Sequence, residues 1–280
     1  FNPPRELTHD EILDIIARFA TAARVSEQAG FDGAQIHGAH GYLVAQFLSP
    51  LHNQRSDQWG GSLENRMRFV CELFKAMRAA TSPNFAIGIK LNSADFQRGG
   101  FTEEEGMEVA ATLAGLGIDM IEVSGGTYEK PVMTGAEKAS TQAREAYFLQ
   151  FAERVREHLG NTPLMLTGGF RTNTVMADSS RGGAVDIVGL ARPLVMAPAL
   201  GQQLLKDDHV KSDIQPLKTW LPVLKDNIAL MEIQWYTQQM KRIGLGKTVQ
   251  PNVSVVWAFL KYLREDLIKG QKTNRLRASS

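Results

Sequence analysis

The sequence predicts an α/β protein built on a parallel β-sheet, and three observations lead to this prediction. Five short apolar segments with the length of buried strands alternate with longer segments of helical periodicity. Glycine-rich loops follow several of these strands. The 280 residues are 43% hydrophobic and 22% charged, a balance typical of folded globular chains. Strands that alternate with helices form right-handed βαβ units, so we expect a parallel sheet covered by helices.

The first predicted helix begins after Thr8, because Thr8 and Glu11 form a capping box before a helical apolar series that ends at Gly30. A buried strand is expected over residues 31–37. A long polar and glycine-rich loop follows over residues 38–61. A loop of that length in a compact domain indicates a function.

The middle of the chain repeats the pattern. Ser62 is the expected cap of the next helix, which leads to a strand over residues 85–91. Thr102 and Glu105 form a second capping box, and the helix that they begin is followed by a strand over residues 119–123.

The last strands follow a helix predicted over residues 145–159, and they occupy residues 163–167 and 185–189. A short helix after Thr172 separates them, and from Pro193 onward the pattern is wholly helical. Five strands fit an open sheet or an incomplete barrel, and the residue pattern leaves both architectures open.

The composition excludes several classes of function. Lys and Arg number 31 and Asp and Glu 30, so the net charge of +1 provides no overall field to hold nucleic acid or an anionic membrane. No apolar run reaches the roughly 18 residues that a membrane-spanning helix needs. Cys71 is the single cysteine and lies in a helical apolar pattern, so we expect a buried thiol, no disulfide and a cytoplasmic location.

The first candidate site residues, His37, His40 and Tyr42, follow the first predicted strand. Imidazoles donate hydrogen bonds to a developing oxyanion and a phenol delivers a proton, so the three suit acid-assisted reduction of a conjugated carbonyl. Two alternatives stay open. His37 and His40 have a spacing compatible with a metal ion, although no nearby Cys or carboxylate completes a ligand set and we expect no metal. The pair could also be purely structural.

A second candidate site follows the last two strands, where Gly168 and Gly169 precede Ala191 and Arg192 in chain order. Small residues let backbone amides approach an anion, and an arginine adds a forked positive charge, as in the phosphate site of a barrel. Alternatively, the glycines only turn the chain and Arg192 pairs with a surface acid.

A third candidate is Lys90, a lone positive charge at the end of an apolar strand. It either faces an anionic ring or phosphate or pairs with Asp95, and the sequence favours neither. Asn92 and Phe96 follow closely and are expected to line the same mouth. In residues 49–66 we expect polar side chains to fix the loop through internal hydrogen bonds, and we assign no catalytic role there.

Four segments of the chain are distinctive when taken together. They are residues 30–43, 46–50, 53–57 and 60–66, with the sequences GFDGAQIHGAHGYL, QFLSP, NQRSD and GGSLENR. These segments resemble the signature of the Old Yellow Enzyme family of flavin-dependent ene reductases, and the similarity covers most of residues 6–250. The resemblance implies a (β/α)8 TIM barrel that binds FMN at its carboxyl-end mouth. It also implies that hydride passes from NAD(P)H to the flavin and then to the β-carbon of an activated alkene.

The resemblance further implies roles for individual residues. His37 and His40 match the pair that hydrogen-bonds the carbonyl or nitro oxygen of the substrate, with Asn at the second position in other members. Tyr42 matches the phenol that protonates the α-carbon, and Lys90 matches the cation beside the pyrimidine end of the flavin. Phe96 is expected to bind substrate. The residues that match the phosphate cradle are Gly168, Gly169, Ala191 and Arg192.

In one respect the sequence departs from the family. There the histidine segment follows the fourth barrel strand, so this chain would supply about strands 4 to 8 and lack the first three βα units. Such a barrel would expose two strand edges and an apolar interior, so we expect a fragment, or a piece that joins another polypeptide. The expected domains are a partial FMN-binding TIM barrel over residues 1–205 and a helical C-terminal extension over residues 206–280 that packs on it.

The primary hypothesis is therefore an FMN-dependent oxidoreductase that uses NAD(P)H to reduce the C=C bond of α,β-unsaturated carbonyl compounds or related electrophiles. We expect a small-molecule alkene as partner and neither nucleic acid nor membrane, and a homo-oligomer is compatible with the sequence. One rival is a catalytically silent barrel fragment or scaffold that needs the missing N-terminal strands to bind flavin. Another is a phosphate-binding barrel without redox chemistry, such as a lyase or an isomerase.

Overall fold

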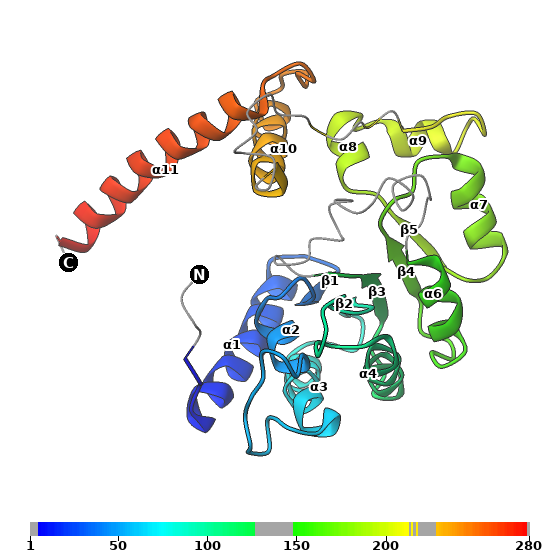
Figure 1. The fold of residues 1–280 in the computed structure, drawn as a ribbon, viewed down its shortest axis with the longest axis vertical. Helices are drawn as coiled ribbons and strands as arrows, with labels where there is room; N and C mark the ends of the chain where they lie inside the picture. The colour runs from blue at the N-terminus through cyan, green and yellow to red at the C-terminus, as the bar shows by residue number, and fades with distance from the viewer. Residues whose placement is uncertain (1–4, 127–147, 213, 215–216, 218–227, 279–280) are drawn as a thin grey trace. The chain divides into compact units, whose positions relative to one another are not determined.

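The structure is a computed structural model that describes residues 5–126, 148–212, 214, 217 and 228–278 (Figure 1). The chain divides into two compact units. Unit 1 comprises residues 1–170 and 174–189, and unit 2 comprises residues 171–173 and 190–280. The division predicted from the sequence, 1–205 and 206–280, stays a prediction, and residues 213, 215–216 and 218–227 of the predicted extension lie outside the described residues.

Unit 1 contains one five-stranded parallel sheet in the order β1-β2-β3-β4-β5. Its strands are β1 (Gly33–Gly38), β2 (Ala86–Asn92), β3 (Met120–Ser124), β4 (Leu164–Thr167) and β5 (Ile187–Gly189). Its helices are α1 (His9–Gln28), α2 (Leu43–Leu48), α3 (Leu63–Ala80), α4 (Glu103–Gly115), α6 (Leu149–Arg156) and α7 (Asn173–Arg181). Each strand pairs with the next in the chain, so every crossover runs in one direction and the helices follow one another along the outside of the strands (Figure 1). This is the winding of a β/α barrel. It excludes a doubly wound sheet, which is the common form of the open sheet that the residue pattern allowed.

The helix starts that the sequence predicts are confirmed by their caps. The Thr8 side chain accepts a hydrogen bond from the Glu11 backbone N–H, and the Glu11 side chain accepts one from the Thr8 backbone N–H. The capping box of Thr102 and Glu105 is formed in the same way at α4. Ser62 caps α3 by accepting from the Asn65 backbone N–H. These local bonds satisfy amide groups that have no partner inside a helix.

Several predicted boundaries were wrong. The first strand begins at Gly33, because the backbone N–H of Phe31 still bonds to a carbonyl of α1 and its side chain is 66% exposed. The predicted loop over residues 38–61 contains α2, whose six residues are too few for a helical period to be recognised. The other strands are shifted or shortened by one or two residues at their ends. The predicted helix start at Glu145 lies outside the described residues, and α6 is described from Leu149.

The two faces of the sheet differ in chemistry. Alternate residues of a strand point to opposite faces. On the face that packs against the helices, the side chains are apolar and almost fully buried: Ile36, Ile87, Ile89, Ile121, Val123, Leu164 and Leu166. On the opposite face, here called the polar face, most side chains form hydrogen bonds or carry charge: Gln35, His37, Lys90, Asn92, Glu122, Ser124 and Thr167. Seven polar groups on one face of a buried parallel sheet indicate a surface that meets a ligand.

Unit 2 is helical in its described part, as the sequence predicts from Pro193 onward. Its helices are α8 (Arg192–Met196), α9 (Leu200–Leu204), α10 (Ile228–Gly244) and α11 (Val255–Ala278). A small core joins α10 to α11, in which Trp235 is 2% exposed and donates its indole N–H to the Val253 carbonyl at 2.8 Å. Within the described parts of both units, no helix has the length and apolar character needed to cross a membrane.

Candidate active site

Three aromatic side chains cluster at the carboxyl end of β1. The ring of His37 lies 5.3 Å from that of His40 in an edge-to-face arrangement and 4.8 Å from that of Tyr42, measured between ring centroids. His37 is on β1, His40 follows the strand, and Tyr42 is the residue before α2. The Tyr42 side chain does not cap this helix, and the residue is 43% exposed. The structure thus brings together the three residues of the first predicted site.

His40 is held by both its backbone and its ring. Its backbone N–H donates to the Asn92 side-chain oxygen at 3.1 Å, and its Nε2 shares a 2.8 Å hydrogen bond with the Ser124 hydroxyl. Asn92 and Ser124 are 2% and 3% exposed, so β2 and β3 provide fixed partners for this imidazole. Such partners determine the orientation of the ring, which a hydrogen-bond donor to substrate requires.

Both histidines are neutral near pH 7. Burial lowers the pKa of His40 to about 4, and the Lys90 ammonium and, once it is protonated, the His37 ring lower it further. Burial and the Lys90 ammonium also lower the pKa of His37, against an opposing effect of Glu122. A neutral imidazole carries one N–H, so each ring can donate a hydrogen bond to an oxygen without giving up a proton.

Lys90 does not pair with Asp95, which was one of its two predicted environments. Its ammonium binds the Glu122 carboxylate at 2.5 Å, across the pairing of β2 with β3. Asp95 instead accepts the Phe101 backbone N–H at 3.0 Å. The Lys90 side chain retains 19% exposure on the polar face, so it forms an internal ion pair and still borders the space over the sheet.

The glycine pair after β4 has an unusual backbone. Gly168 has φ +136° and Gly169 has φ +78°, both in the region that residues with a side chain rarely adopt. Because β4 is parallel to β1 and β2, the pair lies at the same edge of the sheet as the histidines and Lys90. Two glycines with this backbone at that edge fit the close approach of a phosphate.

Ala191 and Arg192 belong to unit 2. Ala191 precedes α8, and Arg192 is its first residue. The Arg192 guanidinium donates to the Glu232 carboxylate of α10 at 2.9 Å, and the Glu232 side chain is 12% exposed. Arg192 therefore has an acidic partner, as in the alternative that the sequence allowed. The role of Ala191 and Arg192 in a phosphate cradle stays a prediction.

Two site residues have strained backbones. Among the non-glycine residues that the structure describes, His40 has φ +62° and Phe96 has φ +57°. The left-handed region costs a non-glycine residue on the order of 1 to 3 kcal/mol, and such strain is concentrated at functional sites. The Phe96 ring is 6.2 Å from that of Phe148, and Phe96 is 37% exposed.

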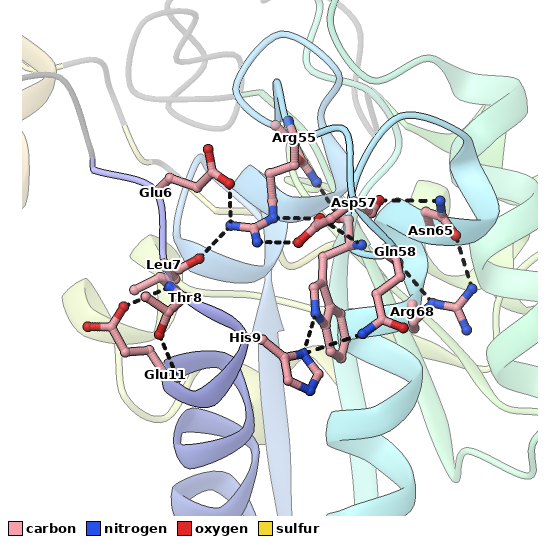
Figure 2. Close-up of polar contacts among 12 residues, drawn as sticks. Glu6, Leu7, Thr8, His9, Glu11, Arg55, Asp57, Gln58, Asn65 and Arg68 are labelled. Atoms are coloured by element: carbon pink, nitrogen blue, oxygen red, sulfur yellow. Dashed lines mark hydrogen bonds and ion pairs between the residues drawn. The ribbon is translucent and has the colours of Figure 1, made fainter.

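The loop over residues 49–66 is fixed by internal hydrogen bonds of its polar side chains, as predicted from the sequence. Asn53, 8% exposed, donates to the carbonyls of Phe47 and Trp59, both at 2.8 Å. Arg55 binds Asp57 and the Leu7 carbonyl, connecting the loop to the segment before α1 (Figure 2).

The indole N–H of Trp59 donates to His9 Nδ1 at 3.1 Å, a second connection between the loop and α1. Gln58 and Arg68 extend this network along the loop and α3 (Figure 2). These residues stabilise the loop that follows Tyr42 and α2.

Sequence reasoning missed Glu122, Ser124, Gln35 and Thr167. The signal was present, because each is a polar residue at an alternate position of a strand whose other positions are apolar. The predicted strands were judged by their apolar residues, so this second periodicity was not used. Among the described residues, no group of three or more His, Cys, Asp or Glu side chains could hold a metal ion.

A sequentially wound parallel sheet with a polar site at the carboxyl ends of its strands defines the class of β/α-barrel proteins. The chain belongs to the NADH:flavin oxidoreductase / NADH oxidase family, which it matches over residues 1–209. Members of this family use FMN with NADH or NADPH as the hydride donor. The resemblance to the Old Yellow Enzyme family is thereby confirmed.

Individual relatives support this assignment. The chain is 42% identical to the NADH-dependent flavin oxidoreductase iccE of Talaromyces variabilis over 215 residues, which are 75% of this chain and 52% of that protein. The structure of a 2-naphthoyl-CoA reductase complex matches with a TM-score of 0.68 and 31% identity, over 74% of this chain and 32% of the other. An old yellow enzyme homologue from Zymomonas mobilis shares the fold, with a TM-score of 0.60 and 24% identity over 76% and 57% of the two chains. The chain thus spans about half the length of the first of these relatives.

Proposed function

We propose that this chain forms the substrate-activating part of an FMN-dependent oxidoreductase that uses NAD(P)H to reduce the C=C bond of α,β-unsaturated carbonyl compounds or related electrophiles. The observation that carries the proposal is the ring cluster of His37, His40 and Tyr42 beside the Lys90–Glu122 pair. Two neutral N–H donors and a phenol on one side of a site match the needs of a substrate whose oxygen gains charge while its carbon gains a proton.

The chain's own residues would divide the work as follows. His37 and His40 hydrogen-bond the carbonyl oxygen and stabilise the charge that develops on it, with the ring of His40 held by Ser124. Tyr42 donates the proton to the α-carbon; its ring lies 4.8 Å from that of His37, and the residue is exposed enough for a substrate to reach it. Phe96 lines the substrate mouth. FMN, when bound, supplies the hydride for the β-carbon.

The residues present fit FMN. Lys90 is the cation suited to the pyrimidine end of the flavin, and the positive-φ backbone at Gly168 and Gly169 suits its phosphate. We further propose that β1 to β5 correspond to strands 4 to 8 of an eight-stranded barrel. The sequential strand order and the 52% coverage of the Talaromyces relative support this correspondence.

The first test is a titration of FMN into the purified chain, followed by quenching of flavin fluorescence. Micromolar or tighter binding supports a flavin site within these residues. No quenching contradicts such a site in the isolated chain and favours the silent-fragment hypothesis, in which further barrel strands are needed for flavin to bind.

The second test replaces the proposed proton donor. In the FMN-loaded protein, Tyr42→Phe should leave reduction of the flavin by NAD(P)H unchanged and slow reduction of an α,β-unsaturated ketone about 100-fold or more. Tyr262→Phe on α11 is the matched control and should change neither step. The two half-reactions are followed separately by stopped-flow absorbance of the flavin, and a fast second half-reaction in Tyr42→Phe would exclude this phenol as the donor.

A further inference from the structure

One carboxylate lies at the centre of the polar face. Glu122 is on β3 with its side chain 8% exposed, and its partners come from three other strands. Lys90 on β2 binds Oε1 at 2.5 Å, and the Thr167 hydroxyl on β4 donates to the same oxygen at 2.6 Å. Gln35 on β1 donates its amide to Oε2 at 2.9 Å. Both oxygens of this buried carboxylate are therefore satisfied by side chains on a single face of the sheet.

The partners of Glu122 distinguish it from the acids nearby that stabilise the fold. Asp95 accepts a backbone N–H from Phe101. Asp119, the residue before β3, accepts one from Ile87 and pairs with Arg78. The hydrogen bonds of Glu122 come from side chains of the polar face, and the pairing of β2 with β3 places it directly beside Lys90. An acid that served only the fold would be expected to bind backbone groups or residues of the helix-covered face.

The position of Glu122 also connects the parts of the proposed site. Thr167 directly precedes the glycine pair, so one hydrogen bond links the carboxylate to the end of β4. Ser124, two residues further along β3, binds the ring of His40. The carboxylate thus lies between the cation, the glycine turn and the histidine cluster.

We propose that Glu122 is a positioning residue that holds the Lys90 ammonium in place on the polar face. Its negative charge also reduces the electrostatic effect of that ammonium on the histidine cluster and on the bound flavin. This inference rests on the proposed function for its flavin part only. Burial raises the pKa of the Glu122 carboxyl, but the hydrogen bonds from Lys90 and Thr167 outweigh it and leave the pKa below its ordinary value. The carboxylate therefore stays charged beside Lys90 at neutral pH, and the pair together carries no net charge.

The offset of charge has two measurable consequences. Without the negative charge, the Lys90 ammonium acts alone on its surroundings. Among the described residues, the titratable groups facing His37 are His40, Tyr42, Lys90 and Glu122. Losing the Glu122 carboxylate should therefore weaken proton binding by His37. The same uncompensated cation should favour reduced FMN over oxidised FMN, because reduction adds negative charge to the ring.

The experiment compares four forms of the full chain: wild type, Glu122→Gln, Lys90→Met/Glu122→Gln and Asp119→Asn. The first readout needs no flavin and is the NMR titration of the His37 ring. Glu122→Gln should lower the proton affinity of His37 on the order of threefold to tenfold. The double variant removes both charges and should return the proton affinity of His37 to the wild-type value or above it, because Lys90 affects His37 more than Glu122 does; general structural damage would not be rescued in this way. Asp119→Asn removes a negative charge just before the start of the same strand and should have little effect.

The second readout is the reduction potential of the bound FMN. Glu122→Gln should increase the preference for reduced over oxidised FMN about tenfold. For a two-electron couple, this is a rise of about 30 mV in the reduction potential of the bound FMN. An unchanged His37 titration together with an unchanged potential would overturn the proposal and assign Glu122 to the fold alone. A wild-type chain that binds no FMN would contradict a flavin site in the isolated chain and favour the silent-fragment hypothesis, and the His37 titration would then decide by itself whether Glu122 offsets the charge of Lys90.

Discussion

Arg66 offers a direct test of how the loop after the histidine cluster is stabilised. This arginine is on α3 with its side chain 5% exposed. Its guanidinium donates to the carbonyls of Leu48 and Gly61 and pairs with the Glu105 carboxylate, with the Gly61 bond at 3.1 Å. One side chain thus joins the end of α2, the loop and the start of α4. Arg66→Met keeps most of the apolar stem and removes all three interactions.

The loss of stability in Arg66→Met can be worked out from the groups that lose their partner. A buried carbonyl that loses its donor costs about 1 to 3 kcal/mol, and breaking a buried ion pair by removing one partner costs about 3 to 5 kcal/mol. The Glu105 side chain is 23% exposed, so water replaces part of the lost interaction. We therefore expect Arg66→Met to lower the free energy of unfolding by about 3 kcal/mol. Arg68→Met on the same helix is the comparison. Arg68 also binds the loop through the Gln58 carbonyl and lies near Asn65 and Glu64, but its side chain is 36% exposed, so water can replace these partners and the change should cost about 1 kcal/mol or less.

The assay is urea unfolding followed by circular dichroism and by tryptophan fluorescence. Trp59 is 3% exposed and directly reports on the loop. The reasoning is refuted if the two arginine variants unfold at the same urea concentration. It is also refuted if Arg66→Met and the wild type unfold at the same urea concentration, because the three interactions would then contribute nothing to stability.

Three further predictions concern other contacts of unit 1. Asn53→Ala should lower the free energy of unfolding by about 2 kcal/mol in the same urea assay, because the buried Asn53 amide binds the carbonyls of Phe47 and Trp59. A loss of stability no larger than that of Arg68→Met would contradict this role. The pKa of His40 is lowered to about 4 from 6.5, so the unfolded chain takes up a proton first as the pH falls. Its stabilising contribution is complete above pH 6.5 and is lost between pH 6.5 and 4, by about 3 kcal/mol, and His40→Asn should flatten that part of the stability profile. Gly189→Ala should destabilise the protein by about 1 to 3 kcal/mol, because the added Cβ would lie 1.9 Å from the Thr167 hydroxyl oxygen, and an unchanged melting temperature would contradict this clash.

Local features of the fold could be predicted from the sequence because their causes are local. The caps at Thr8, Ser62 and Thr102 depend on residues three positions apart, and the structure confirms all three. The five strands were found from short apolar runs, with errors at their ends, since a boundary such as Phe31 depends on hydrogen bonds to the preceding helix. The six residues of α2 were missed for lack of length.

The residues of the candidate site were also visible in part. His37, His40 and Tyr42 are close in the sequence, so their meeting in space required only the turn after β1. Lys90 was conspicuous as a charge in an apolar strand, but the sequence offered an anionic ligand or Asp95 as its partner, and the structure pairs it with Glu122, 32 positions away.

The sequence by itself therefore determined the element order, the helix starts, the presence of polar groups at the ends of strands and the family. Only the tertiary structure decided which of these groups meet. Glu122 pairs with Lys90 and Ser124 with His40 because the register of β2 with β3, and of β1 with β2, brings residues 32 and 84 positions apart to one face. The reason is physical: strand register is set by the packing of all the helices and strands together, and no short segment of the chain contains that information.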